Sequence, residues 1–170
     1  LFPYTTLFRS PRYSKEKEQE LGLALRSGNV AKARETLDEL FRELASTTPL
    51  PKPAYLISVV REIGSFAVRV LLESVSEEEA AELESGLAAL ATAPAGFREL
   101  ERLVADICER GCRLIERRRQ SDSARIIDEA IRYIRSSLGG HLTLVDCALH
   151  VYLSGNYFAG LFKKVTGQTF

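Results

Sequence analysis

Hydrophobic residues recur at steps of three and four from Lys15 onward, which is the spacing of one face of an α-helix. One such face precedes the tripeptide Ser27-Gly28-Asn29 and another follows it. Gly28 suits the end of the first helix and Asn29 suits the N-cap of the second, so the pattern predicts two helices joined by a tight turn. The apolar positions are Leu21, Leu25, Val30, Ala33, Leu37, Leu40, Phe41 and Leu44.

A loop and a strongly apolar helix come next. Pro49, Pro51 and Pro53 predict the loop, because proline fixes φ and has no backbone donor. In the helix that follows, apolar residues cover most of the circumference, so we expect it to be central to the fold. These residues are Leu56, Val59, Val60, Ile63, Phe66, Ala67, Val70 and Leu71.

Two more helices are predicted before residue 120. Ser76 with Glu79 has the spacing of a capping box and opens a helix that the stretch 94–96 ends. The apolar spacing from Phe97 to Ile115 predicts a long helix that ends in the basic run 117–119, where cations oppose the helix dipole. No alternating strand pattern with a hairpin turn occurs, so the predicted fold class is all-α.

The polar residues 121–123 are interpreted as a break and a domain boundary. After it, Ile127, Ile131, Ile134 and Leu138 share one helix face that ends at Gly139-Gly140. A short helix opening at residue 144, with Thr143 as its cap, and another from Gly155 to about Val165, with Ser154 as its cap, complete a helix-turn-helix layout. Ala148 is expected where the two helices cross closely, Cys147 is expected to face inward, and Phe162 is expected to be buried.

Composition adds three expectations, on membrane spans, on the cellular compartment and on the origin of the chain. The chain has 23 Lys and Arg, 23 Asp and Glu, 45% apolar residues and no run long enough to cross a bilayer. Three cysteines, an odd number, favour a reducing compartment, and we predict the cytoplasm. The absence of Met, with Leu1 at the start, is interpreted as an internal fragment, and residues 1–10 back-translate to a widely used sequencing adapter. The alternative for residues 1–10 is a natural aromatic-rich strand or loop.

The last 45 residues resemble the beginning of the AraC/XylS-type DNA-binding domain. The matching motifs are Leu142-Thr143-Leu144, Ala148, Leu153-Ser154, Tyr157-Phe158, Leu161-Phe162-Lys163-Lys164, Thr166-Gly167-Gln168 and Phe170, at the spacing of that family. The resemblance implies two helix-turn-helix units joined by a linking helix, of which this chain carries the first. It also implies double-stranded DNA as partner, contacted through Ser154, Gly155, Asn156, Tyr157, Ala159, Gly160, Lys163 and Lys164.

The segment 13–21 and the turn after it are similar to helices that precede this domain in Gram-positive regulators. Many of those are two-component response regulators of the YesN type, which we favour, and others carry membrane sensors.

The predicted organisation of the whole chain has three parts: an adapter-derived segment (1–10), a helical linker or regulatory bundle (11–122) and a homeodomain-like three-helix helix-turn-helix unit (123–170). The helical part has a net charge of −3 and the last part +2. A homodimer through the helical part is compatible with this organisation. The alternative function is a helical signalling or dimerisation module that does not itself bind DNA.

No residues are grouped as catalysis, a cofactor or a metal would require, so we predict no enzyme activity. Cys108 and Cys112 lie one helical turn apart without further ligands in the sequence nearby, which favours core packing. His141 and His150 flank the short helix and are interpreted as a surface and a half-buried imidazole. Val145 and Leu149 occupy positions that are usually polar in the family, either because they pack on the helical part or through neutral drift.

Overall fold

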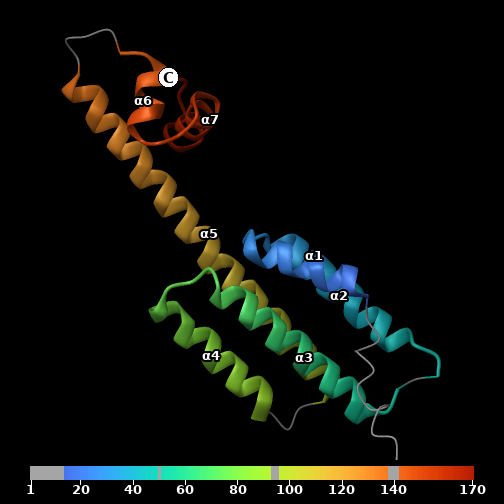
Figure 1. Ribbon diagram of the computed structural model, residues 1–170. Coiled ribbons are helices and arrows are strands. Elements are labelled where there is room, and N and C mark those ends of the chain that lie inside the picture. Colours follow the sequence, from blue (N-terminus) through green and yellow to red (C-terminus); the bar gives the residue numbers. More distant parts are fainter. Residues whose placement is uncertain (1–13, 50, 93–95, 138–141) are drawn as a thin grey trace, which may run out of the picture. The chain divides into compact units, whose positions relative to one another are not determined.

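Seven helices make up the described part of the chain in a computed structural model, which covers residues 14–49, 51–92, 96–137 and 142–170 (Figure 1). No strand occurs in these ranges, and the all-α prediction is confirmed. The chain divides into two units, Leu1–Glu116 and Arg117–Phe170. The segment interpreted as adapter-derived, the helix end predicted at Gly139-Gly140 and the surface position predicted for His141 lie outside the described residues.

The first unit begins with α1 (Lys15–Arg26) and α2 (Val30–Ser46), joined by the predicted turn. The Asn29 side chain accepts a hydrogen bond from the Lys32 backbone N–H at 3.0 Å and so caps α2. Gly28 has a φ of +68°, and a Cβ there would lie 3.0 Å from the carbonyl oxygen of Cys112. This position therefore requires glycine both for its backbone conformation and for the space that Cys112 leaves.

Next come α3 (Pro53–Leu72) and α4 (Glu77–Thr92), and Figure 1 shows α3 between α1 and α4. Pro53 stands at the start of α3, where its missing N–H has no partner to lose. The capping box of α4 is confirmed, because Ser76 N–H donates to Glu79 Oε2 at 2.9 Å and Glu79 N–H donates to Ser76 Oγ at 3.4 Å. These local signals set the helix starts as the sequence predicted.

Helix α5 (Phe97–Ser136) is longer than predicted. The helix end predicted at residues 117–119 and the break predicted at residues 121–123 are both wrong, because α5 continues through them. No Gly or Pro occurs between Cys112 and Ser136, and Ser or Asp inside a helix costs only tenths of a kcal/mol, roughly 0.5 each. The division between the two units falls inside α5 and not at the polar run.

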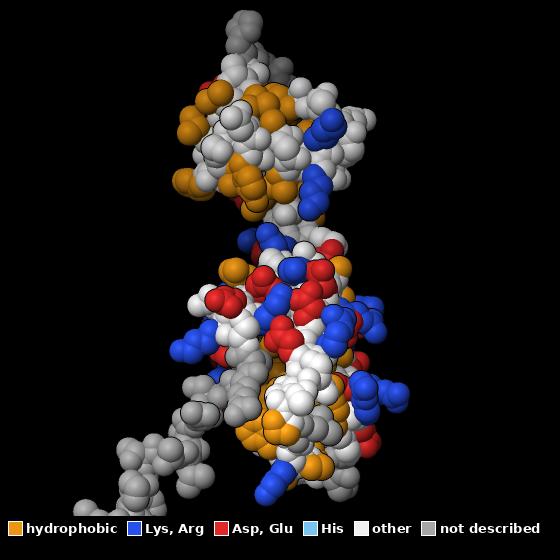
Figure 2. Space-filling view, turned by 90° about the vertical axis from the view of Figure 1, so that its right-hand side faces the viewer, with side chains coloured by type: hydrophobic (Ala, Val, Ile, Leu, Met, Phe, Trp, Pro, Cys, Tyr) orange, Lys and Arg blue, Asp and Glu red, His pale blue; other side chains and the backbone are white. Residues whose placement is uncertain are grey.

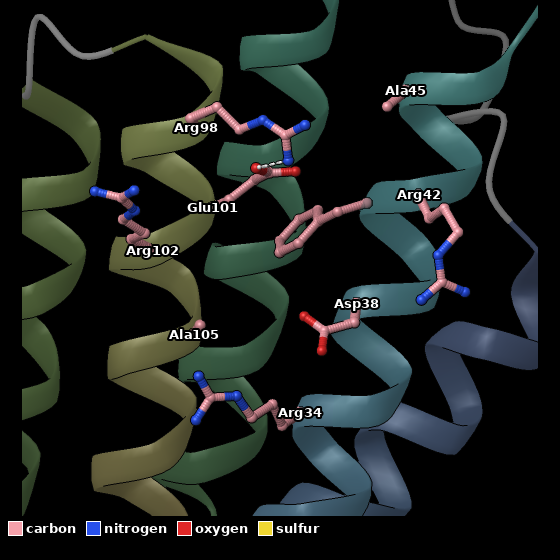
Figure 3. Close-up of a pocket in the computed structure, with 9 residues that line it drawn as sticks. Arg34, Asp38, Arg42, Ala45, Arg98, Glu101, Arg102 and Ala105 are labelled. Atoms are coloured by element: carbon pink, nitrogen blue, oxygen red, sulfur yellow. Dashed lines mark hydrogen bonds and ion pairs between the residues drawn. The ribbon is translucent and has the colours of Figure 1, made fainter.

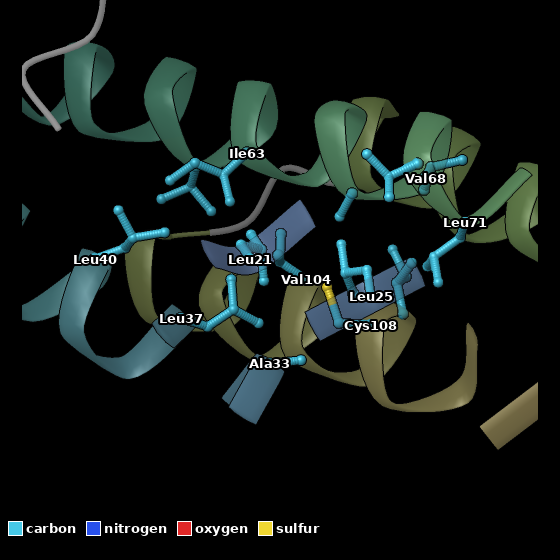
Figure 4. Close-up of a cluster of buried hydrophobic side chains, with 14 of the residues drawn as sticks. Leu21, Leu25, Ala33, Leu37, Leu40, Ile63, Val68, Leu71, Val104 and Cys108 are labelled. Atoms are coloured by element: carbon cyan, nitrogen blue, oxygen red, sulfur yellow. The ribbon is translucent and has the colours of Figure 1, made fainter. Parts of the chain in front are cut away.

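Side chains from α1, α2, α3, α4 and the first half of α5 form the core of the first unit (Figure 4). The prediction that α3 is central is confirmed, since nine of its residues are buried. Cys108 and Cys112 lie in this core as predicted, at 1% and 0% exposure. Burial raises the pKa of both thiols, that of Cys112 to about 11. Both therefore act as small apolar side chains at neutral pH.

Candidate nucleic-acid interface

The second unit packs the end of α5 against α6 (Leu144–His150) and α7 (Gly155–Thr166). Its core is small and draws on all three helices: Ile127, Ala130, Cys147, Ala148, Phe158 and Leu161. Ala148 is 1% exposed and Cys147 is fully buried, so both predicted inward positions are confirmed. Two short helices joined by a tight connection and covered by a third helix are the arrangement of a helix-turn-helix unit.

Helix α6 begins with a second capping box. Thr143 Oγ1 accepts from the Asp146 backbone N–H at 3.2 Å, and Asp146 Oδ2 accepts from the Thr143 backbone N–H at 2.9 Å. The Thr143 hydroxyl also donates to Asp146 Oδ2 at 2.6 Å. These hydrogen bonds, first of all the one from the Thr143 side chain, lower the pKa of the Asp146 carboxyl. Thr143 therefore caps α6 as predicted, and the same hydrogen bonds favour the ionised form of Asp146.

The connection between α6 and α7 is a tight turn. Leu153 N–H donates to the Ala148 carbonyl at 2.8 Å, and Tyr152 has a φ of 59° in the left-handed region. Tyr152 is also 95% exposed, so its ring takes no part in the core. Ser154 is the N-cap of α7 by its backbone, but its side chain makes no capping hydrogen bond. The prediction of a Ser154 side-chain cap is wrong, because the hydroxyl of this exposed residue is not turned onto the helix amides.

Helix α7 has one buried face and one exposed face. Phe158 and Leu161 face the core. Asn156, Gly160 and Lys163 are exposed and lie at i, i+4 and i+7, so they share the opposite side of the helix. The eight residues implied by the family resemblance are therefore all accessible: Ser154, Asn156, Tyr157, Gly160, Lys163 and Lys164 are exposed, and Gly155 and Ala159 are half-exposed.

The two glycines of α7 differ in their surroundings. A Cβ on Gly155 would lie 3.2 Å from Leu144 Cδ2, so this glycine allows α6 and α7 to approach closely. A Cβ on Gly160 would meet nothing within 4 Å. Gly160 therefore leaves the backbone of α7 uncovered on its exposed face. Packing inside the unit does not require a glycine at this position.

Phe162 is half-buried, and the prediction of its burial is therefore wrong in degree. Its ring lies 5.7 Å from Phe158 and 5.6 Å from Phe170, measured between ring centroids. Phe158 is the aromatic residue that fills the core, at 0% exposure. Phe162 is next to this core and is covered on one side by Phe170, which is itself 44% exposed.

One aromatic contact of this unit had no signal in the sequence. The rings of Tyr133 on α5 and His150 on α6 are stacked with centroids 3.9 Å apart and planes 8° apart. His150 is exposed, so the prediction of a half-buried imidazole is wrong, although its ring is held by Tyr133. Pairing two residues that are 17 positions apart requires knowledge of how α6 packs on α5.

Hydrophobic side chains also lie on the outside of this unit, as Figure 2 shows for the face turned to the viewer. Val145 is 57% exposed and Leu149 is 66% exposed, one turn apart on α6. Neither belongs to the core of the unit. Both expectations for these positions, packing on the helical part and neutral drift, stay predictions.

The second unit is basic. Residues 117–170 hold eight Lys and Arg against four Asp and Glu, a net charge of +4, and the remaining 116 residues carry −4. Six of these basic residues are arginines of α5, which holds three of the four acidic residues of this unit, and Arg125 lies 3.7 Å from Asp122. The last turn of α7 holds Lys163 and Lys164, for which the structure gives no ion pair with a described residue. Helix α7 thus carries two lysines and no acidic residue.

Comparison with known proteins gives one match. A stretch of 42 residues is 52% identical to the Regulatory protein PocR of Salmonella typhimurium (strain LT2). It covers 25% of this chain and 14% of that protein, so the chain spans about one seventh of its relative. No protein-family model matches the chain, and no solved structure matches it. In the described residues, no helix has the length and apolar character of a membrane span, and no group of His, Cys, Asp and Glu is placed to hold a metal ion.

Proposed function

We propose that the second unit is the DNA-binding part of a transcription regulator and that α7 is its reading helix. The observation that carries this proposal is the two-faced character of α7, whose buried face holds it on α5 and α6 while the opposite face carries Asn156, Gly160 and Lys163. A helix fixed in this way can enter the major groove of DNA. The similarity to a regulatory protein and the net charge of +4 support the same proposal.

Each predicted residue has a role that its chemistry allows. Lys163 and Lys164 pair with phosphates, and the first amides of α7, next to Ser154, can donate to another phosphate. Asn156 is the side chain suited to a base edge, since an amide can donate to and accept from adenine. Gly155, Ala159 and Gly160 bring backbone close to the duplex without polar side chains, while Tyr157 adds an exposed ring. With so few base-reading groups, much of the specificity of this helix must come from DNA shape.

The finer assignment rests on the family resemblance. We propose an AraC/XylS-type regulator, with the helical part as its linker or regulatory region, and favour a YesN-type response regulator. Double-stranded DNA is the proposed partner, the cytoplasm the proposed location and a homodimer through the helical part the proposed assembly, without enzyme activity. The alternative is that the helical part is a signalling or dimerisation module and that this chain does not bind DNA.

The proposal is tested by fluorescence anisotropy with labelled duplexes at several salt concentrations. We expect weak binding with little sequence preference, and a log–log salt slope of roughly −2 to −3, because about two or three phosphates are neutralised. The variant Lys163→Gln/Lys164→Gln should reduce that slope by about 2, as two phosphate contacts are lost. Arg69→Gln, an exposed change on α3, is the control and should leave the slope unchanged. An unchanged slope in the lysine variant would contradict the role proposed for α7, and a chain that binds none of the duplexes would favour the alternative.

A further inference from the structure

Asn156 lies in the first turn of α7, on the exposed side of the helix. The structure gives its side-chain amide no hydrogen bond with a described residue. The residues next to it on this side, Ala159 and Gly160, carry no polar side chain, and Tyr157 points about 100° further round the helix. In a helix-turn-helix unit, the N-terminal residues of the second helix contact base edges. Asn156 is therefore the side chain of α7 best placed to meet a base.

The residue types of α7 also discriminate between base pairs. The helix has no arginine, which is the commonest reader of guanine, and no Asp or Glu, which accept a hydrogen bond from cytosine. Its lysines, Lys163 and Lys164, stand in the last turn, seven and eight positions after Asn156 and at the other end of the helix. An asparagine amide matches adenine, because it can accept from N6 and donate to N7 at the same time. The exposed side of α7 therefore suits an A·T pair better than a G·C pair.

Gly160 lies one turn after Asn156 on the same side of α7. It is exposed, and a Cβ there would meet nothing within 4 Å, so the space over its backbone is open. Thymine presents a C5-methyl group in the major groove, next to the edge of its paired adenine. The open space at Gly160 can accommodate this methyl group, and the half-exposed Ala159 can give it an apolar contact.

We propose that α7 reads an A·T pair in the major groove, with Asn156 on the adenine and Ala159 and Gly160 against the thymine methyl group. Asn156 accepts from adenine N6 and donates to N7, while the lysines of the last turn bind phosphates. This base preference rests on the function proposed for α7 and adds the base pair that the helix selects. One amide and one methyl contact give a modest preference, which is compatible with the weak binding expected of this unit.

Fluorescence anisotropy with three alternating duplexes of equal length tests the base preference: A–T, A–U and hypoxanthine–cytosine. An alternating duplex offers the same pairs in every register, so no operator sequence has to be chosen. Hypoxanthine lacks the N2 amino group of guanine, so its pair with cytosine resembles A·T in the minor groove and G·C in the major groove. The A–U duplex differs from the A–T duplex by the thymine methyl groups alone.

We expect the A–T duplex to bind about fivefold or more tightly than hypoxanthine–cytosine, the lower end of what one bidentate pair discriminates. It should bind about threefold more tightly than A–U, the value of burying one methyl group. Both ratios should persist when the salt concentration is raised, because the phosphate contacts are common to all three duplexes.

Two variants of α7 test the two contacts separately. Asn156→Ala should remove the preference for A–T over hypoxanthine–cytosine, because the amide is lost. Gly160→Leu fills the open space and should remove the advantage of thymine over uracil. Lys163→Gln should weaken the binding of all three duplexes by the same factor. Circular dichroism verifies that each variant keeps its helix content.

Arg102→Gln is the control for the loss of a surface cation outside α7. Arg102 belongs to the part of α5 in the first unit, and Figure 3 shows its guanidinium group pointing away from the cleft between α2 and α5. Its substitution should leave both ratios unchanged.

Equal binding of the A–T and hypoxanthine–cytosine duplexes, or a preference that survives Asn156→Ala, would overturn the base preference. The function proposed for α7 would remain in that case, because all duplexes would still bind with the expected dependence on salt. A thymine advantage that survives Gly160→Leu would overturn the place given to the methyl group. A chain that binds none of the three duplexes would overturn both the base preference and the proposed function.

Discussion

The rings of Tyr133 and His150 are stacked, with centroids 3.9 Å apart and planes only 8° from parallel. Tyr133 belongs to α5, and His150 is the last residue of α6. The contact thus joins the C-terminal end of the short helix to the long helix on which it packs. It lies outside the buried cluster of the unit and adds a second point of attachment for α6.

We expect His150→Ala to lower the stability of the second unit by about 0.5–1.5 kcal/mol, the value of an aromatic pair beyond its buried area. Tyr133→Leu removes the same contact and also changes the packing of a half-buried side chain. Urea unfolding of both single variants and the double variant, followed by circular dichroism, isolates the coupling. Tyr152→Ala is the control, because Tyr152 is 95% exposed and should contribute nothing measurable. Strict additivity of the two changes would show that the stacked rings do not interact.

The difference in burial between Phe158 and Phe162 predicts unequal effects. Phe158→Ala should cost about 3–5 kcal/mol, because the ring is fully buried and a cavity remains. Phe162→Ala should cost about half as much, since its ring is half-buried and less apolar surface is lost. Chemical unfolding of both variants measures the two values. Equal losses would contradict the assignment of Phe158 as the central aromatic residue.

Gly28 and Gly160 should respond in opposite directions to the same substitution. Gly28→Ala should destabilise the first unit by about 1–2 kcal/mol, because a left-handed residue with a Cβ is strained. The Cβ would also lie 3.0 Å from the Cys112 carbonyl oxygen. Gly160→Ala should stabilise the second unit by roughly 0.5–1 kcal/mol, because the site is helical and open. Thermal unfolding provides the comparison, and a stabilising effect at Gly28 would contradict the described turn.

The capping box of α6 predicts a pH dependence. The pKa of Asp146 is lower in the folded protein than its ordinary value of 3.8, because Thr143 donates to the carboxylate. Its stabilising contribution is therefore present above pH 3.8 and is lost as the pH falls through the lower folded pKa. Asp146→Asn should be less stable than the unchanged chain at neutral pH and should approach it at acidic pH. Unfolding measured over this pH range checks the sign, and a difference that grows on acidification would contradict it.

The sequence predicted the features that depend on neighbouring residues. The turn at Gly28, the capping box of Ser76 and the cap at Thr143 follow from residues a few positions apart, and the structure has each of them. The eight residues assigned to DNA were implied by the family resemblance, and the structure leaves all of them exposed or half-exposed. Their contact with DNA stays a prediction.

The features that the sequence did not predict depend on packing between distant segments. The polar run 121–123 is only weakly unfavourable in a helix, so its sequence could not distinguish a break from a continuous α5. Phe162 has the residue type of a core position, yet Phe158 occupies the centre. Tyr133 and His150 stack only because α6 packs on α5, and no local spacing of residues indicates that contact.

The most direct test of the central claim, that α7 is the surface that meets DNA, is a chemical-shift titration. Backbone amides of the labelled 170-residue chain would be followed by NMR while a short duplex is added at low salt. We predict that the largest changes fall on residues 154–164, with few changes in α1, α2, α3 and α4. Changes centred on the arginines of α5 or on the first unit, with α7 unaffected, would contradict the account.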